Sequence, residues 1–88
     1  MSQIVFIHDT VKSFILDEFL PDESPDALED STPLITTSIL DSIATLQLVT
    51  FLEEKFDIQI QAHETSVDHL NTLSDIVRLV ASKKGVET

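Results

Sequence analysis

Apolar residues recur at intervals of three and four residues in two long stretches of the first two thirds of the chain. This spacing is typical of amphipathic helices. The first stretch predicts a helix over residues 2–20, which Pro21 ends. The second predicts a helix over residues 42–56, and either Asp41 or Ser42 can act as its N-cap.

The last third of the chain predicts one more long helix and one short one. The long helix covers residues 72–84, begins with a Thr-x-x-Asp capping signal and stops at Gly85. An extended connector over residues 57–63 and a short helical turn over residues 65–70 precede it. Because the chain has one Gly and three Pro, signals for hairpins are few. We therefore expect an all-α fold, a small four-helix bundle with three longer helices and one short helix, as a single domain over residues 1–88.

A long loop separates the first two predicted helices. Residues 21–41 are rich in Pro, Ser, Thr and acidic side chains. A loop of this length is unusual inside a compact domain and is often functional. Five apolar residues are expected to hold parts of it against the core: Leu28, Leu34, Ile35, Ile39 and Leu40.

The helix predicted at residues 42–56 is apolar on two sides. At about 100° per residue, one side forms an ordinary core face with Leu48, Val49, Leu52 and Phe56. The opposite side carries a mixed set of apolar, polar and acidic residues: Ile43, Leu46, Gln47, Thr50, Glu53 and Glu54. We interpret this side as a docking surface, where apolar contact provides affinity and the acids provide orientation. The alternative is that Ile43 and Leu46 pack under the long loop.

Acidic residues dominate the charge of the protein. Sixteen Asp and Glu stand against five Lys and Arg, which gives a formal charge of −11. Between Lys12 and Lys55 there are ten acids and no Lys or Arg. Such a surface repels the phosphates of nucleic acids and of anionic membranes, so we expect neither as a partner. It favours proteins with basic patches, although the acids can also serve solubility alone.

Several kinds of chemistry are not expected of this chain. It has no Cys and therefore no disulfide, thiolate metal site or thiol nucleophile. His8, His63 and His69 lack a metal-binding spacing and are expected to be solvated or capping, and the acidic loop lacks the EF-hand pattern. A bundle this small offers little concavity for catalysis, so we expect no enzyme. Without a long apolar run or a secretion signal, we expect a cytoplasmic monomer.

The tetrapeptide Leu40-Asp41-Ser42-Ile43 lies where the acidic loop meets the second predicted helix. It resembles the phosphopantetheine attachment motif of acyl and peptidyl carrier proteins, Asp-Ser-Leu or Asp-Ser-Ile. The similarity continues through SILDSIATLQLVTFLEEKFDIQI to the closing segment NTLSDIVRLV. A helix N-terminus also suits a phosphodiester, because it offers unpaired N–H groups and the positive end of the helix dipole. By itself, however, a serine here is more commonly a plain N-cap.

The resemblance implies that Ser42 carries 4'-phosphopantetheine, which a phosphopantetheinyl transferase moves from coenzyme A. Leu40, Asp41 and Ile43 would surround the attachment point, and Asp41 would cap the helix or help to present the serine. Four residues match partner-facing positions of the family: Leu46, Thr50, Glu53 and Glu54. The expected function is an acyl carrier protein that holds acyl intermediates as thioesters for fatty-acid or secondary-metabolite biosynthesis. Its partners would be loading ligases or synthases with basic patches.

The sequence departs from the family pattern in two places. Ala44 and Gln47 stand where many fatty-acid carriers place acids, and Ile39-Leu40 replaces the Gly-Gly that often precedes the motif in peptidyl carriers. We therefore favour a stand-alone carrier with a dedicated ligase or synthase. Two alternatives remain: a stand-alone aminoacyl or peptidyl carrier, and an acidic interaction module that is never modified.

Overall fold

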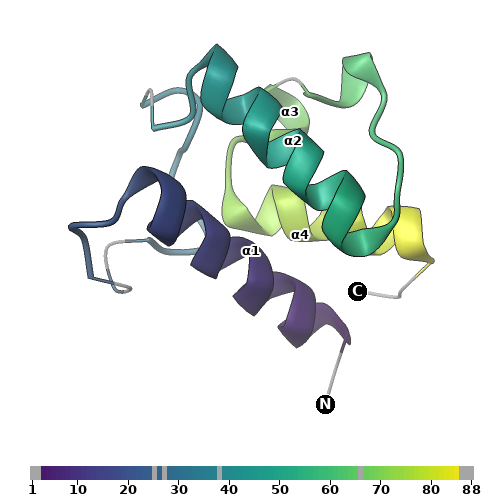
Figure 1. Ribbon diagram of the computed structural model, residues 1–88, viewed down its shortest axis with the longest axis horizontal. Coiled ribbons are helices and arrows are strands. Elements are labelled where there is room, and N and C mark those ends of the chain that lie inside the picture. The colour runs from purple at the N-terminus through teal and green to yellow at the C-terminus, as the bar shows by residue number, and fades with distance from the viewer. Residues whose placement is uncertain (1–2, 25, 27, 38, 66, 86–88) are drawn as a thin grey trace.

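The computed structural model describes residues 3–24, 26, 28–37, 39–65 and 67–85, and these form helices and connecting segments without strands. Three helices are long and one is short, which confirms the all-α four-helix architecture (Figure 1). The elements in chain order are α1 (Gln3–Phe19), α2 (Ser42–Phe56), the 3-10 helix η2 (Ala62–Thr65), α3 (Val67–Leu70) and α4 (Leu73–Lys84). None of the helices in this part of the chain has the length and apolar character needed to cross a bilayer.

One hydrophobic core lies between the helices. The predicted core face of α2 is confirmed, because Leu48, Val49, Leu52 and Phe56 are all buried. Helix α1 turns a stripe of three residues toward this core, and α4 contributes a wider face. The buried residues of these two helices are Ile7, Val11 and Ile15 in α1, and Leu73, Ile76, Val77, Leu79, Val80 and Ala81 in α4. The helix spacing in the sequence therefore predicts which side of each element faces inward.

Five apolar residues of the loop between α1 and α2 pack into this core. Leu28, Leu34 and Leu40 are fully buried, and Ile35 and Ile39 are half-buried against them. The expectation that apolar loop residues hold the loop to the core is confirmed. In Figure 1 the loop (blue) lies at the end of the bundle where α1 ends and α2 begins.

The connector after α2 is shorter than predicted. Asp57 ends the helix in the left-handed region, with φ of 55°. Ile60 is buried, as expected for an inward isoleucine, but the 3-10 helix η2 already begins at Ala62. The extended segment therefore stops at Gln61. The Glu64 carboxylate accepts a hydrogen bond from the Gln61 backbone N–H at 2.8 Å and so caps the first turn of η2.

Two lysines at the end of α4 connect it to its neighbours. The Lys84 ammonium donates to the carbonyl oxygen of Phe56 at 3.0 Å, which stabilises the C-terminal end of α2. Lys83 pairs with Glu64 at 2.6 Å, and this contact holds the pKa of Glu64 below its usual value. These lysines therefore serve other elements as well as the end of their own helix.

His8 does more than the sequence indicates. We expected a solvated or capping histidine, but its side chain is half-buried between α1 and the loop. Its Nε2 lies 2.6 Å from Asp30 Oδ1, and its Nδ1 lies 3.1 Å from Asp9 Oδ1. The Asp30 hydrogen bond raises the pKa of His8, burial lowers it, and Asp9 raises it further, with a net increase above 6.5. Arg78 of α4 lines the same hollow as His8 and Asp30.

This geometry predicts a pH-dependent contribution of His8 to stability. Because the folded-state pKa lies above the value of 6.5 for the free side chain, the contribution is fully present below pH 6.5. It disappears as the pH rises through the folded-state pKa, where the imidazolium loses its proton. We expect the difference in free energy of unfolding between the wild type and His8→Gln to shrink as the pH rises from just below 6.5 to 9. Urea titrations across this range measure it, and a difference that grows with pH would contradict the assignment.

Candidate functional site

Asp41 is the N-cap of α2. Its backbone is extended, with φ of −78° and ψ of −173°, and its carboxylate Oδ1 accepts a hydrogen bond from the Ala44 N–H at 2.7 Å. Its carbonyl oxygen accepts from the Thr45 N–H at 2.8 Å and so starts the helical bonding pattern. Of the two N-cap candidates in the sequence, the structure therefore selects Asp41. The alternative of Ser42 as a plain N-cap is wrong.

Ser42 is the first residue of α2, and its side chain is exposed. Within the described part of the chain, its hydroxyl takes part in no hydrogen bond with another side chain or the backbone. The first N–H groups of a helix lack intrahelical acceptors, and the helix dipole is positive at this end. An exposed hydroxyl at this position fits a covalently attached phosphodiester, which those N–H groups would stabilise.

The two apolar residues that flank Asp41-Ser42 have opposite environments. Leu40 is 1% exposed and belongs to the core, whereas Ile43 is 70% exposed. We expected both side chains near the prosthetic group, but a buried Leu40 side chain offers it no surface. The Leu40 side chain instead fixes the motif to the core, whereas Ile43 is exposed to solvent like Ser42.

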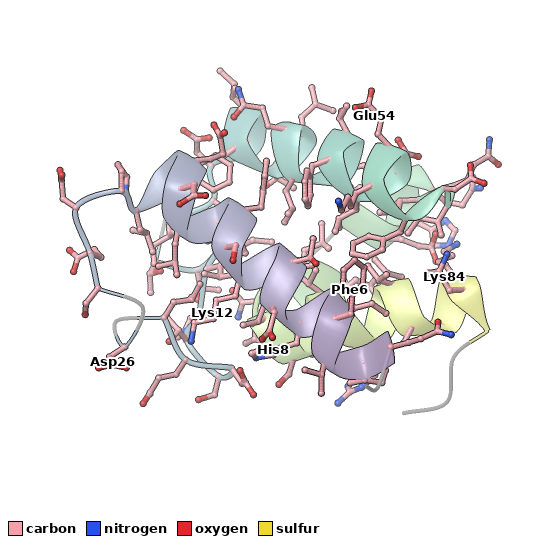
Figure 2. The ribbon with its side chains drawn as sticks, turned by 60° about the horizontal axis from the view of Figure 1, so that its bottom comes forward. Phe6, His8, Lys12, Asp26, Glu54 and Lys84 are labelled. Carbon is pink, nitrogen blue, oxygen red and sulfur yellow. The ribbon has the colours of Figure 1, made fainter. Side chains whose placement is uncertain are left out.

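The outer side of α2 is open to solvent. Ile43 and Leu46, with exposed fractions of 70% and 66%, are among the most exposed large apolar residues of the described chain. They do not pack under the loop, so that alternative is wrong. Gln47, Thr50 and Glu54 are exposed beside them, and Figure 2 shows Glu54 pointing outward from α2. Exposed apolar groups rimmed by polar ones are typical of interaction surfaces.

Two other residues of α2 differ from the sequence-based description. Ala44 is buried, so the lack of an acid there has no effect on the outer surface. Glu53 is half-buried, and its Oε2 accepts a hydrogen bond from the Ile60 N–H at 3.0 Å. Glu53 therefore holds the connector after α2. The outer side of α2 is left with five exposed residues, which we call the docking face: Ile43, Leu46, Gln47, Thr50 and Glu54.

A shallow groove of about 470 Å³ continues the docking face toward α1. Phe14 of α1 and Phe51 of α2 stack there, with ring centroids 4.0 Å apart. Glu18 and Glu54 lie among the residues that line the groove, together with Leu46 of the docking face. The groove is therefore lined by both aromatic and acidic side chains.

Sequence reasoning did not identify Asn71, which lies between α3 and α4. Its side-chain oxygen accepts hydrogen bonds from the N–H groups of Ile35 and Thr36, at 3.0 and 3.2 Å. The only signal available was an Asn just before the N-cap Thr72, which resembles any polar helix boundary. Its partners are 35 and 36 residues away in the chain, beyond the reach of local patterns.

Known proteins similar to this chain are carriers. No protein-family model matches it. The acyl carrier protein of Picosynechococcus sp. is 31% identical over 85 residues, which cover 97% of this chain and 98% of that protein. The D-alanyl carrier protein of Streptococcus gordonii is 33% identical over 63 residues, covering 72% of this chain and 77% of that protein. In fold, the chain is similar to apo KstB-PCP, with a TM-score of 0.64, 20% identity, and coverage of 85% and 82%.

The chain therefore belongs to the acyl carrier protein family, and the resemblance seen in the sequence is confirmed. Its relatives are carrier proteins, which are not catalysts, so this protein is a carrier and not an enzyme. Carriers of this family in general bear a phosphopantetheine arm and interact with modifying and loading enzymes. The helical fold matches the carrier fold of KstB-PCP.

The capping geometry generates a prediction about Asp41. Replacing Asp41 by Ala removes the acceptor for the Ala44 N–H and should lower the free energy of unfolding by about 0.5–2 kcal/mol. Asp41→Asn keeps an oxygen acceptor and should lose much less. Urea denaturation monitored by circular dichroism measures the free energy of unfolding of each variant. Equal losses in the two variants would show that the charge of Asp41, and not its capping bond, stabilises α2.

Proposed function

We propose that this protein is an acyl carrier protein with 4'-phosphopantetheine attached to the Ser42 hydroxyl. A phosphopantetheinyl transferase would move the arm from coenzyme A in the cytoplasm. The observation that carries the proposal is the exposed Ser42 hydroxyl at the first position of α2, beside a separate capping residue, Asp41. Because Asp41 caps the helix, modification of Ser42 does not cost the helix its cap.

In this proposal, the residues around Ser42 have different roles in presenting the arm. The arm, when attached, supplies the thiol that holds acyl groups as thioesters, which this Cys-free chain lacks. Asp41 and Leu40 would hold the start of α2 in place, the first from the helix end and the second from the core. Ile43 lies exposed next to Ser42, where an enzyme that handles the arm would meet it.

The cargo has two candidates. An acyl cargo is supported by the similarity to the acyl carrier protein of Picosynechococcus sp. over almost the whole chain. An aminoacyl cargo, loaded by a dedicated ligase, is supported by the similarity to D-alanyl carrier proteins over 72% of the chain. Both use the same attachment serine, so the test of the site is common to them.

The docking face is the proposed surface for partner enzymes. Ile43 and Leu46 would bury their apolar side chains against a partner, and Glu54 would attract and orient a basic patch. The net charge of −11 strengthens this attraction at low ionic strength. Since Glu53 binds the Ile60 N–H, docking in this proposal depends on Glu54 rather than on Glu53.

Intact mass spectrometry tests the attachment site. Incubation with coenzyme A, magnesium and a transferase of broad specificity should add about 340 Da to the wild type, which is the mass of the arm. Ser42→Ala should add nothing, whereas Ser82→Ala, which alters an exposed serine of α4, should gain the same mass as the wild type. A mass gain in Ser42→Ala would move the site elsewhere. A wild type that every competent transferase leaves unmodified would favour the acidic interaction module.

Charge reversal tests the docking face. Glu54→Lys should lower kcat/KM of the transferase for the carrier by roughly threefold or more at low salt, with the loss reduced at about 0.5 M salt because the ions screen it. Glu23→Lys makes the same change of net charge in the exposed loop and is the matched control. If the two variants lower kcat/KM equally, the attraction depends on net charge alone, and this result would contradict a specific docking face.

A further inference from the structure

Four hydrogen bonds converge on Asn71. Its backbone oxygen accepts from the Leu34 N–H at 2.6 Å. Its side-chain Oδ1 accepts from the Ile35 and Thr36 N–H groups at 3.0 and 3.2 Å, and from the Thr36 hydroxyl at 3.5 Å. All four bonds use oxygen atoms of Asn71 as acceptors, so a residue with an oxygen at the same place can replace them.

The residues before and after Asn71 in the chain fix its position. The residue before it, Leu70, is fully buried, and the residue after it, Thr72, is the N-cap of α4. The Thr72 hydroxyl accepts from the Asp75 N–H at 3.1 Å. Asn71 is therefore a fixed point on the helical part of the protein, and the loop segment at residues 34–36 is attached to it.

The hydrogen bonds from Asn71 to the loop continue to the residue before Asp41 and Ser42. The Leu40 N–H donates to the carbonyl oxygen of Leu34 at 2.9 Å, so the residue that binds Asn71 also binds the residue just before Asp41. Leu34 and Leu40 are both buried. Leu34 therefore connects Asn71 to Leu40, and Leu40 directly precedes the N-cap of α2.

The buried leucines alone do not define the orientation of this loop. Apolar burial is nondirectional and tolerates sliding of the backbone, whereas hydrogen bonds between a fixed acceptor and two successive N–H groups specify a direction. Any residue at position 71 can accept the backbone bond from the Leu34 N–H, and the Asn71 side-chain oxygen adds directional contacts to Ile35 and Thr36. A loop without it would keep its leucines in the core but sample more orientations.

We propose that Asn71 is a positioning residue for the modification of Ser42, acting through Leu34 and Leu40. The inference rests on the proposed function, because it concerns the same serine. When only a fraction of the molecules presents the motif correctly, the apparent affinity of the enzyme for the carrier is the intrinsic affinity multiplied by that fraction. The loss therefore affects KM for the carrier, while kcat, which describes the bound complex, stays close to that of the wild type.

Steady-state kinetics of arm transfer test this role, with coenzyme A saturating and the carrier varied. We expect Asn71→Ala to raise KM by roughly threefold to tenfold with kcat within about twofold of the wild type. Asn71→Asp, which keeps the acceptor oxygens, should restore KM to within about twofold of the wild type. Each variant is assayed at a temperature where circular dichroism shows it fully folded. If Asn71→Ala does not fold, Asn71→Ser takes its place, because its shorter side chain does not reach the two N–H groups.

Thr37→Ala is the matched control. The Thr37 hydroxyl donates to the Pro33 carbonyl oxygen at 2.6 Å, a bond inside the same loop that does not reach α4. This variant should leave KM unchanged. Amide hydrogen exchange adds a local measure: the Ile35 and Thr36 amides should exchange faster in Asn71→Ala than in Asn71→Asp, with unchanged exchange in α1.

The outcomes separate this inference from the proposed function. A wild type that takes up no arm overturns the proposed function and the positioning role with it. A wild type that is modified, with an unchanged KM in Asn71→Ala, overturns the role of Asn71 alone. Failure of Asn71→Asp to restore KM, or an equal rise of KM in Thr37→Ala, also overturns it.

Discussion

The burial of three loop leucines controls how this small bundle presents Ser42, the proposed attachment residue. Leu28, Leu34 and Leu40 are fully buried although none of them belongs to a helix. Burying one leucine side chain contributes about 1.5–3 kcal/mol, and this free energy draws a long, acidic loop against the core. The loop leads directly into α2, so its placement determines where that helix begins. The exposed residues at the start of α2 depend on a packing interaction beneath them.

Between Leu40 and Ala44, buried, capping and exposed residues follow one another directly along the chain. Leu40 faces the core, Asp41 caps α2, Ser42 and Ile43 face solvent, and Ala44 faces the core again. Separation of the cap from the exposed hydroxyl matters, because a serine that capped the helix would have its oxygen engaged with a backbone N–H. In this protein an acidic side chain takes that bond, and the hydroxyl beside it remains accessible for chemistry.

The same alternation applies to the acidic residues of α2. Glu53 binds the connector through the Ile60 N–H, whereas the adjacent Glu54 faces solvent on the docking face. Successive residues of a helix point about 100° apart, so neighbouring carboxylates have different surroundings. A charge that looks like part of one acidic patch in the sequence can thus be a structural hydrogen-bond acceptor. The proposed docking face therefore has fewer acidic residues than the sequence of α2 suggests.

Helix periodicity, capping residues and the Asp-Ser motif are local patterns, so the sequence alone predicts the three long helices, their inward faces and the family. It also indicated that apolar loop residues are buried. Only the folded structure shows that Asp41 rather than Ser42 caps α2 and that Glu53 binds the Ile60 N–H. It also shows that His8 and Asn71 bind the loop. These contacts join residues that are far apart in the chain or choose between adjacent donors and acceptors, and only the folded backbone brings such groups to hydrogen-bonding distance.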